Sequence, residues 1–219
     1  MTVVDKMDVR EIFPTPVWVV DLKPDAAKVL NAHLVAEIER LISPRPKVPP
    51  GSNWQTDPIL HTLPAFGEFI AFVETAARGV LNFLKLDHMQ MVITGCWANI
   101  NPPGAYHPMH HHPNNYLSGV YYAQAGSNAS VILFQDPRPQ ASIILPPMPE
   151  MTKFTVNAQA IEARSGRLVL FPAWLKHQVP ANATSEDRIS ISFNLMFPQF
   201  TEKYSAPLWK GSAPTPRGG

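Results

Sequence analysis

The sequence has only one cysteine, Cys96, among its 219 residues, so no disulfide can form within the chain. Cys96 lies in an apolar run over residues 92–100, where a buried thiol that packs like a small hydrophobic side chain is expected. A chain of this length buries about 70% of the surface that it exposes when unfolded, so one core is stable without disulfides. We therefore expect a single domain, residues 1–219.

The sequence also lacks an excess of charge of either sign, because it has 18 Lys+Arg residues and 17 Asp+Glu residues, a formal net charge of +1. This balance gives no electrostatic argument for a nucleic acid or an anionic membrane as partner. No apolar run approaches the roughly 18 residues of a membrane-spanning helix. Charged residues leave no apolar core for a signal peptide in the first dozen positions: Asp5, Lys6, Asp8, Arg10 and Glu11. We expect a cytoplasmic protein with no nucleic-acid or membrane partner, and its assembly is open between monomer and homodimer.

Proline, in contrast, is abundant, and the 24 prolines separate short apolar segments. Residues 13–21 are typical of a short strand. Apolar residues at helical spacing predict a helix from Pro24-Asp25, the expected N-cap, to Leu41 and another from near Pro64 to Leu84. From residue 90 the period changes to two, which predicts strands over residues 91–100, 116–124, 130–134, 142–145, 153–156, 167–171 and 188–197.

This order of elements predicts a mainly β (α+β) fold, a jelly roll with two N-terminal buttressing helices. Residues 1–89 would form the N-terminal strand and helical buttress, residues 90–200 the jelly-roll core, and residues 201–219 a C-terminal tail.

Four of the eight histidines lie within six residues: His107, His110, His111 and His112. In an extended segment, His110 and His112 project from one face while His111 points away. A third imidazole is offered by His177, which follows the apolar strand over residues 167–171 and a proline turn. We interpret His110, His112 and His177 as ligands of one metal ion, and we expect His107 and His111 either to lie behind these ligands or to be exposed. The alternative is a solvated histidine loop and a surface His177.

The predicted strand over residues 188–197 has one apolar and one polar face, and the polar face begins with Arg188, Ser190 and Ser192. Inside a closed barrel, Arg188 would offer a planar fork to a carboxylate and Ser190 a hydroxyl beside it. On a solvent-exposed edge strand, the same alternation would carry no function.

Five stretches of the sequence form a recognisable set of motifs: residues 97–101, His110-x-His112-Pro113, residues 117–122, residues 134–138, and the stretch from Gly166 through His177 to Arg188-x-Ser190. Together they resemble a bacterial family of 2-oxoglutarate and Fe(II)-dependent oxygenases. The resemblance implies a double-stranded β-helix, Fe(II) as the metal, and 2-oxoglutarate as a cosubstrate whose distal carboxylate is bound by an arginine, here Arg188.

His112 departs from the wider superfamily, which usually has a carboxylate at this position to complete a site of two histidines and one carboxylate. Three neutral imidazoles leave the site one unit more positive. Asp136 is a candidate carboxylate ligand, although an ion pair with Arg138 or a role in a turn is an equal alternative.

The spacing from Gly104 to His110-x-His112 also resembles the cupin family, another jelly roll. Tyr116 and Leu117 stand where cupins have a glutamate, and Trp174 stands where they have a glycine. A three-histidine dioxygenase that does not use 2-oxoglutarate is therefore the second hypothesis, and a non-catalytic binding protein on the same barrel is the third. Arg188-x-Ser190 favours the first hypothesis, an oxygenase that uses 2-oxoglutarate.

The favoured hypothesis is a dioxygenase that hydroxylates an unidentified small-molecule or amino-acid/peptide substrate and releases succinate and CO2. Cosubstrate-binding candidates are Arg188, Ser190, Asn99 and Tyr122, and Trp97 and Trp174 are further pocket candidates. The proline-rich residues 136–152 are a candidate lid.

Overall fold

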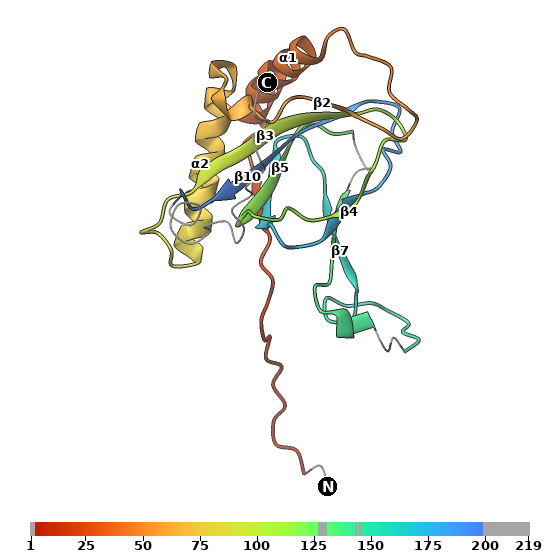
Figure 1. The fold of residues 1–219 in the computed structure, drawn as a ribbon. Helices are drawn as coiled ribbons and strands as arrows, with labels where there is room; N and C mark the ends of the chain where they lie inside the picture. The colour runs from red at the N-terminus through yellow and green to blue at the C-terminus, as the bar shows by residue number, and fades with distance from the viewer. Residues whose placement is uncertain (1–2, 127–130, 143, 145, 199–219) are drawn as a thin grey trace, which may run out of the picture.

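The fold is an open β-barrel of two sheets with two helices on one side (Figure 1). The computed structural model describes residues 3–126, 131–142, 144 and 146–198, so the expected C-terminal tail, residues 201–219, lies outside the described residues. In chain order, the elements are β1 (Trp18–Asp21), α1 (Pro24–Ile42), β2 (Trp54–Gln55), the 3-10 helices η1 (Leu60–Thr62) and η2 (Pro64–Phe66), α2 (Gly67–Phe83), β3 (Val92–Asn101), β4 (His107–His110), β5 (Leu117–Gln124), β6 (Val131–Gln135), the 3-10 helix η3 (Pro139–Ser142), β7 (Ala158–Glu162), β8 (Arg167–Pro172), β9 (His177–Val179) and β10 (Arg188–Met196).

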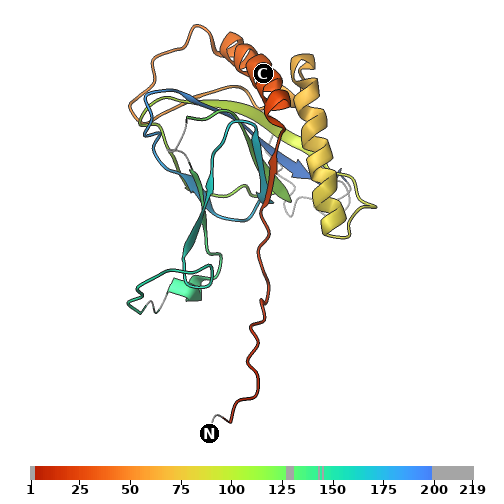
Figure 2. The same ribbon diagram turned by 180° about the vertical axis from the view of Figure 1, so that it is seen from behind.

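The larger sheet has six strands in the order β1-β8-β5-β10-β3-β2, and the smaller has four in the order β4-β9-β6-β7. The two sheets face each other around the barrel interior (Figure 2). The N-terminal strand β1 pairs antiparallel with β8, so it belongs to the same sheet as the strands of the barrel core. The predicted double-stranded β-helix or jelly roll is confirmed.

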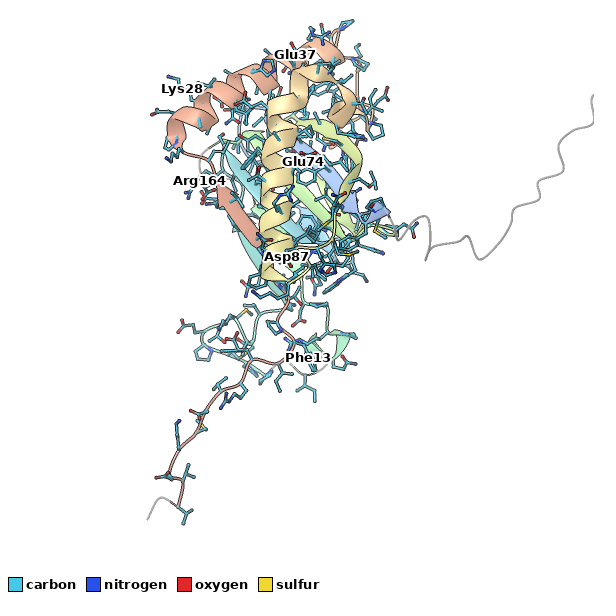
Figure 3. All side chains as sticks on the ribbon, turned by 90° about the vertical axis from the view of Figure 1, so that its left-hand side faces the viewer. Phe13, Lys28, Glu37, Glu74, Asp87 and Arg164 are labelled. Carbon is cyan, nitrogen blue, oxygen red and sulfur yellow. The ribbon has the colours of Figure 1, made fainter. Side chains whose placement is uncertain are left out.

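Both helices cover the outer face of the six-stranded sheet. In each helix, apolar residues at spacings of three and four form the face that packs against the sheet. Charged residues lie on their outer sides, such as Lys28 on α1 and Glu74 on α2 (Figure 3). Asp25 lies in the first turn of α1, whose N-cap is Lys23, so the expected cap at Asp25 is wrong. No helix in the described part of the chain has the length and apolar character that a membrane span requires. The buried helical residues are Ala27, Leu30, Leu34 and Ile38 of α1 and Phe69, Val73, Ala77, Val80 and Leu81 of α2.

The strand β10 shows how the alternating sequence divides the two faces of this sheet. It lies between β5 and β3, so the alternative of an exposed edge strand is wrong. Its apolar residues, including Ile191 and Phe193, pack into the core shared with the helices. Arg188, Ser190 and Ser192 face the barrel interior and line a cavity there. The outer face of the sheet therefore supports the fold, and the inner face is available for a ligand.

The segment between β6 and β7 differs from the expectation. The predicted strand over residues 142–145 is wrong in its described part, because Ser142 ends η3 and Ile144 is 82% exposed without a partner strand. Residues 153–156 form a turn in which the Thr155 N–H donates to the Thr152 carbonyl at 3.0 Å. The strand that pairs with β6 is β7, whose sequence AQAIE alternates only weakly. Figure 1 shows the segment extending away from the barrel, and its function as a lid stays a prediction.

Candidate functional site

Two short strands of the smaller sheet bring His110 and His177 together. β4 and β9 pair antiparallel with His110 opposite His177, so the two side chains lie on one face. The register shifts between His107 and His110, because β4 advances three residues while β9 advances two, from Val179 to His177. This β-bulge directs His107 and His110 to the same side, and both line the cavity between the sheets.

His112 reaches the site by a different route from the one that the sequence suggests. It lies beyond the end of β4, not on a regular strand with His110. The His112 backbone N–H donates to the Ala173 carbonyl at 2.9 Å, which ties this segment to the turn before β9. The three predicted histidines thus meet, although strand periodicity is not the reason for His112.

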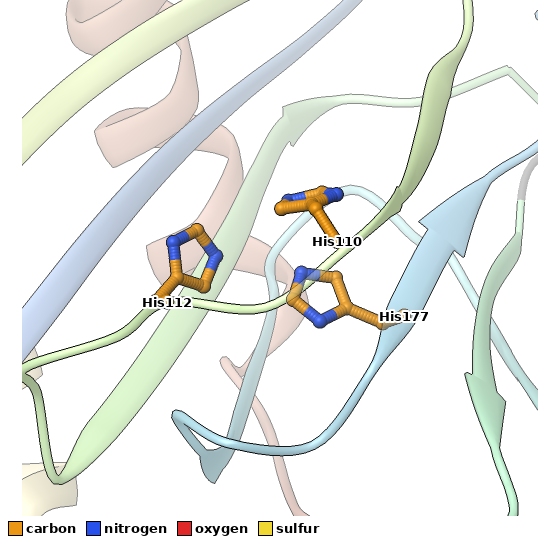
Figure 4. Close-up of side chains that lie close together, drawn as sticks. All are labelled: His110, His112 and His177. Carbon is orange, nitrogen blue, oxygen red and sulfur yellow. The ribbon is translucent and has the colours of Figure 1, made fainter.

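The three imidazoles form a compact cluster in which each ring points toward the others (Figure 4). Ring centroids are 4.3 Å apart for His110 and His177, 5.1 Å for His110 and His112, and 5.2 Å for His112 and His177. One nitrogen from each ring lies within 4.8 Å of the other two, a spacing from which they can hold one metal ion.

Backbone carbonyls fix the tautomer of two of these rings. The Nδ1 atom of His110 lies 2.7 Å from the Pro108 carbonyl, and that of His177 lies 2.9 Å from the Leu175 carbonyl. A carbonyl oxygen only accepts, so each Nδ1 carries a proton and donates it. In the neutral rings, both Nε2 atoms therefore keep their lone pairs for a metal, which is the second-sphere arrangement typical of metal-binding histidines.

Burial keeps two of these imidazoles uncharged. Desolvation lowers the pKa of His112 and of His177 to about 4, and the neighbouring His110 contributes in the same direction. The ring of His177 packs against Phe171 and Phe134 at centroid distances of 4.7 and 5.9 Å. At neutral pH, these two imidazoles are unprotonated and competent as ligands.

From the histidines the cavity, about 240 Å³ in volume, extends to Arg188 at the start of β10. Arg188 is 2% exposed, and burial lowers its pKa whereas the nearby Tyr122 opposes the shift. No aspartate or glutamate occurs among the described residues that line the cavity. A buried guanidinium with three histidines and no carboxylate fits an anionic ligand.

The hydrogen-bonding groups around Arg188 match such a ligand. Asn99, Ser190 and Tyr122 lie opposite one another on β3, β10 and β5, and all line the cavity. The buried Tyr122 hydroxyl has no hydrogen-bond partner among the described residues. Burial also raises the pKa of Tyr122, so this hydroxyl remains a donor. The residues present fit a divalent metal at the histidines and a carboxylate near Arg188.

The structure separates the other sequence-based candidates. Trp97 lines the cavity, with its ring centroid 6.1 Å from that of His112. Trp174 does not: it is 54% exposed, because the turn after β8 directs it to solvent, so its prediction as a pocket residue is wrong. Asp136 pairs with Arg138 at 2.7 Å and lies outside the histidine cluster. His111 is exposed. Two polar cavity residues that the sequence does not identify are His107 and Gln55.

Residues 95–194 match a family model described as "Putative 2OG-Fe(II) oxygenase". Among curated proteins, none matches the chain.

Solved structures of similar fold agree with this match. The epimerase SnoN from nogalamycin biosynthesis, described as a non-heme α-ketoglutarate-dependent enzyme, is 14% identical, with a TM-score of 0.61 over 84% of this chain and 77% of that chain. A Pseudomonas putida prolyl-4-hydroxylase is 16% identical, with a TM-score of 0.56 over 84% and 93% of the two chains. HygX from Streptomyces hygroscopicus, with nickel and 2-oxoglutarate bound, is 14% identical, with a TM-score of 0.57 over 84% and 83%. The family match over residues 95–194 confirms the resemblance of the sequence to 2-oxoglutarate/Fe(II)-dependent oxygenases, a family of oxidoreductases that use Fe(II) and 2-oxoglutarate, and the solved structures show that the chain shares the fold of such enzymes.

Proposed function

We propose that His110, His112 and His177 bind Fe(II), and that Arg188 and Ser190 bind the distal carboxylate of 2-oxoglutarate. The observation that carries the proposal is one cavity lined at the same time by three convergent imidazoles and a buried guanidinium. Asn99 and Tyr122 lie in the same interior row as Ser190, so they complete the polar wall along the cosubstrate.

The proposed reaction is hydroxylation of a C–H bond. When bound, Fe(II) and 2-oxoglutarate supply oxidative decarboxylation: O2 gives one oxygen atom to succinate and one to the substrate, and CO2 is released. The chain contributes position and polarity. The Pro108 and Leu175 carbonyls orient two ligands, Arg188 fixes the far end of the cosubstrate, and Phe171 and Phe134 keep one side of the site apolar.

We propose a small molecule as the substrate. In support, two structures of similar fold contain bound small molecules: HygX contains hygromycin B, and SnoN contains nogalamycin RO. In this chain, Gln55 and Trp97 line the same cavity as the histidines, and Gln55 is exposed, so they are candidate contacts for the substrate. An amino acid or peptide substrate is the alternative within the same reaction class.

The second hypothesis, a three-histidine dioxygenase that does not use 2-oxoglutarate, accounts for the absence of a carboxylate among the described cavity residues. It gives no function to Arg188, which is buried and lines the same cavity. Arg188 is therefore the residue whose substitution separates the two hypotheses.

The test is anaerobic titration of the Fe(II) protein with 2-oxoglutarate. Binding is measured by calorimetry and by the visible absorption band of a bidentate keto acid on iron. Removing one partner of a buried charge pair costs on the order of 3 to 5 kcal/mol, so Arg188→Ala should weaken binding at least about a hundredfold while iron stays bound. Ser190→Ala should cost only about 1 kcal/mol. Arg188→Lys should recover part of the loss, because lysine supplies charge without the planar fork.

Wild-type protein that neither binds millimolar 2-oxoglutarate nor forms succinate from it would reject the cosubstrate. Full iron occupancy in that same protein would then favour the three-histidine dioxygenase, and absence of iron would favour a non-catalytic binding protein.

A further inference from the structure

Neither the family motif nor the metal cluster uses His107 or His111, and of these two histidines only His107 lines the cavity. The bulge in β4 directs it inward, opposite Val179, and it lines the cavity beside His110. It is partly buried, in contrast to the exposed His111. A histidine directed into a ligand cavity and absent from the metal cluster needs a separate explanation.

An amide on the opposite sheet holds the His107 ring. Asn101 is fully buried at the end of β3, directly opposite Arg188 on β10. Its Nδ2 lies 2.9 Å from His107 Nε2, and its Oδ1 lies farther away, at 3.3 Å. The nearer atom is the nitrogen, which only donates, so Nε2 accepts and the neutral ring carries its proton on Nδ1. Nδ1 is then a donor.

Hydrogen bonds from Asn182 hold the backbone at Asn101. The buried Asn182 donates through Nδ2 to the Asn101 carbonyl at 2.9 Å and to the Glu186 carbonyl at 2.7 Å. Its backbone N–H donates to the Ala105 carbonyl at 2.9 Å, and its own carbonyl accepts from the Gly104 N–H at 2.8 Å. Asn182 therefore joins the end of β3, the turn before β4 and the loop that leads into β10, and so fixes His107 relative to Arg188.

His107 is near both Arg188 and the metal-binding histidines. It shares β4 with His110, and Asn101, which contacts its ring, lies opposite Arg188 on the neighbouring strand. Burial is the largest cause of its lowered pKa of about 4, and Arg188 and His110 act in the same direction. The His107 ring therefore lines the cavity that also contains the metal-binding histidines and Arg188.

We propose that His107, oriented by Asn101, is a cosubstrate-binding residue that donates a hydrogen bond from Nδ1 to 2-oxoglutarate between the metal site and Arg188. Asn101 is a positioning residue that acts through His107. This inference rests on the proposed function, since it presupposes that 2-oxoglutarate occupies the cavity.

The test measures iron content and the dissociation constant of 2-oxoglutarate under anaerobic conditions for His107→Leu and His107→Asn, with His111→Leu as the matched control. A hydrogen bond to a charged group is worth about 1.5–3 kcal/mol, so His107→Leu should raise the dissociation constant about tenfold or more. His107→Asn, which keeps a donor near the Nδ1 position, should recover part of the affinity. His111→Leu should bind as wild type does, and all three should keep full iron content.

Asn101→Ala tests the same contact with His107 intact. If Asn101 acts through His107, the double variant should bind 2-oxoglutarate about as weakly as His107→Leu alone, because the two losses are not additive. A merely structural effect would lower the melting temperature without this dependence.

Unchanged 2-oxoglutarate affinity in His107→Leu, or loss of iron from it, would overturn the inference while the proposed function stands. Failure of the wild type to bind 2-oxoglutarate, or Arg188→Ala binding as wild type does, would overturn the proposed function itself.

Discussion

Each histidine of the site is controlled by different neighbours, although the side chains are chemically identical. His177 is oriented by the Leu175 carbonyl and desolvated by Phe171 and Phe134. His107 is oriented by the Asn101 amide. In both cases, burial lowers the pKa to about 4, so the folded metal-free protein holds neutral imidazoles well below the pH at which free histidine takes up a proton.

The metal-free protein should therefore lose stability in mild acid. The unfolded chain protonates His107 near pH 6.5, whereas the folded protein does so only near pH 4, so the unfolded state binds more protons as the pH falls between these values. The stability is fully present above about pH 6.5 and is lost toward about pH 4. Between pH 7 and 5, wild type should lose about 2 kcal/mol more than His107→Gln, measured by urea unfolding.

His111→Gln is the control for this prediction, because His111 is exposed. Its free energy of unfolding should follow that of wild type across the pH range. An equal loss in wild type and His107→Gln would show that His107 is not buried in neutral form.

At the scale of elements, the sequence predicts the helices and strands whose apolar residues recur at a regular spacing. It misses a strand whose formation depends on pairing with a neighbouring strand. The helices α1 and α2 follow from apolar residues at spacings of three and four, and β10 follows from alternation over nine residues. β7 has no strong pattern of its own and is defined by its pairing with β6, so the sequence instead predicts strands in the proline-rich segment before it.

The site shows the same division. His110 and His177 were identified because a histidine tract and a distant histidine after a strand are visible in the sequence. The cavity-lining position of His107 was not identified, because its inward direction comes from a bulge in the pairing of β4 with β9. The register of this pairing cannot be predicted from the sequence of either strand alone. Trp174 was wrongly placed for a similar reason: whether a turn residue faces the cavity or solvent depends on the turn.

Close approach of β5, β8 and β10 gives a prediction for glycine. A Cβ on Gly119 would lie 2.3 Å from Phe193 Cζ and 3.0 Å from Leu170 Cδ2, in the core under the helices. Gly119→Ala should therefore destabilise the protein by about 1–3 kcal/mol, because the buried Phe193 must move from its packed position. Chemical denaturation checks this value.

Gly79 provides the matched control, as it is exposed on α2 and no atom would lie within 4 Å of an added Cβ. Gly79→Ala should stabilise the protein by about 0.5–1 kcal/mol, since alanine favours the helix. Equal effects of the two substitutions would contradict the packing argument.

At the scale of the whole molecule, the site joins the two sheets. His110 and His177 belong to the four-stranded sheet, whereas Arg188 and Ser190 belong to the six-stranded sheet. The metal is expected at one sheet and the distal carboxylate of the cosubstrate at the other, so bound 2-oxoglutarate would bridge them. The site should therefore form in two coupled steps, with the metal first.

This coupling predicts how ligands change thermal stability. A ligand at a hundred times its dissociation constant stabilises the folded state by about 2.7 kcal/mol, which corresponds to about 5–10 °C for a chain of this size. Under anaerobic conditions, Fe(II) should raise the melting temperature of metal-free protein, and 2-oxoglutarate should raise it further only when Fe(II) is present. Arg188→Ala should keep the first increase and lose the second, and His177→Ala should lose both, because without bound metal the keto acid has no anchor at the histidine end.

A chelator should reverse both increases in wild type. An equal 2-oxoglutarate increase with and without Fe(II) would mean that Arg188 binds the carboxylate independently of the metal, and the two-sheet bridge would be rejected.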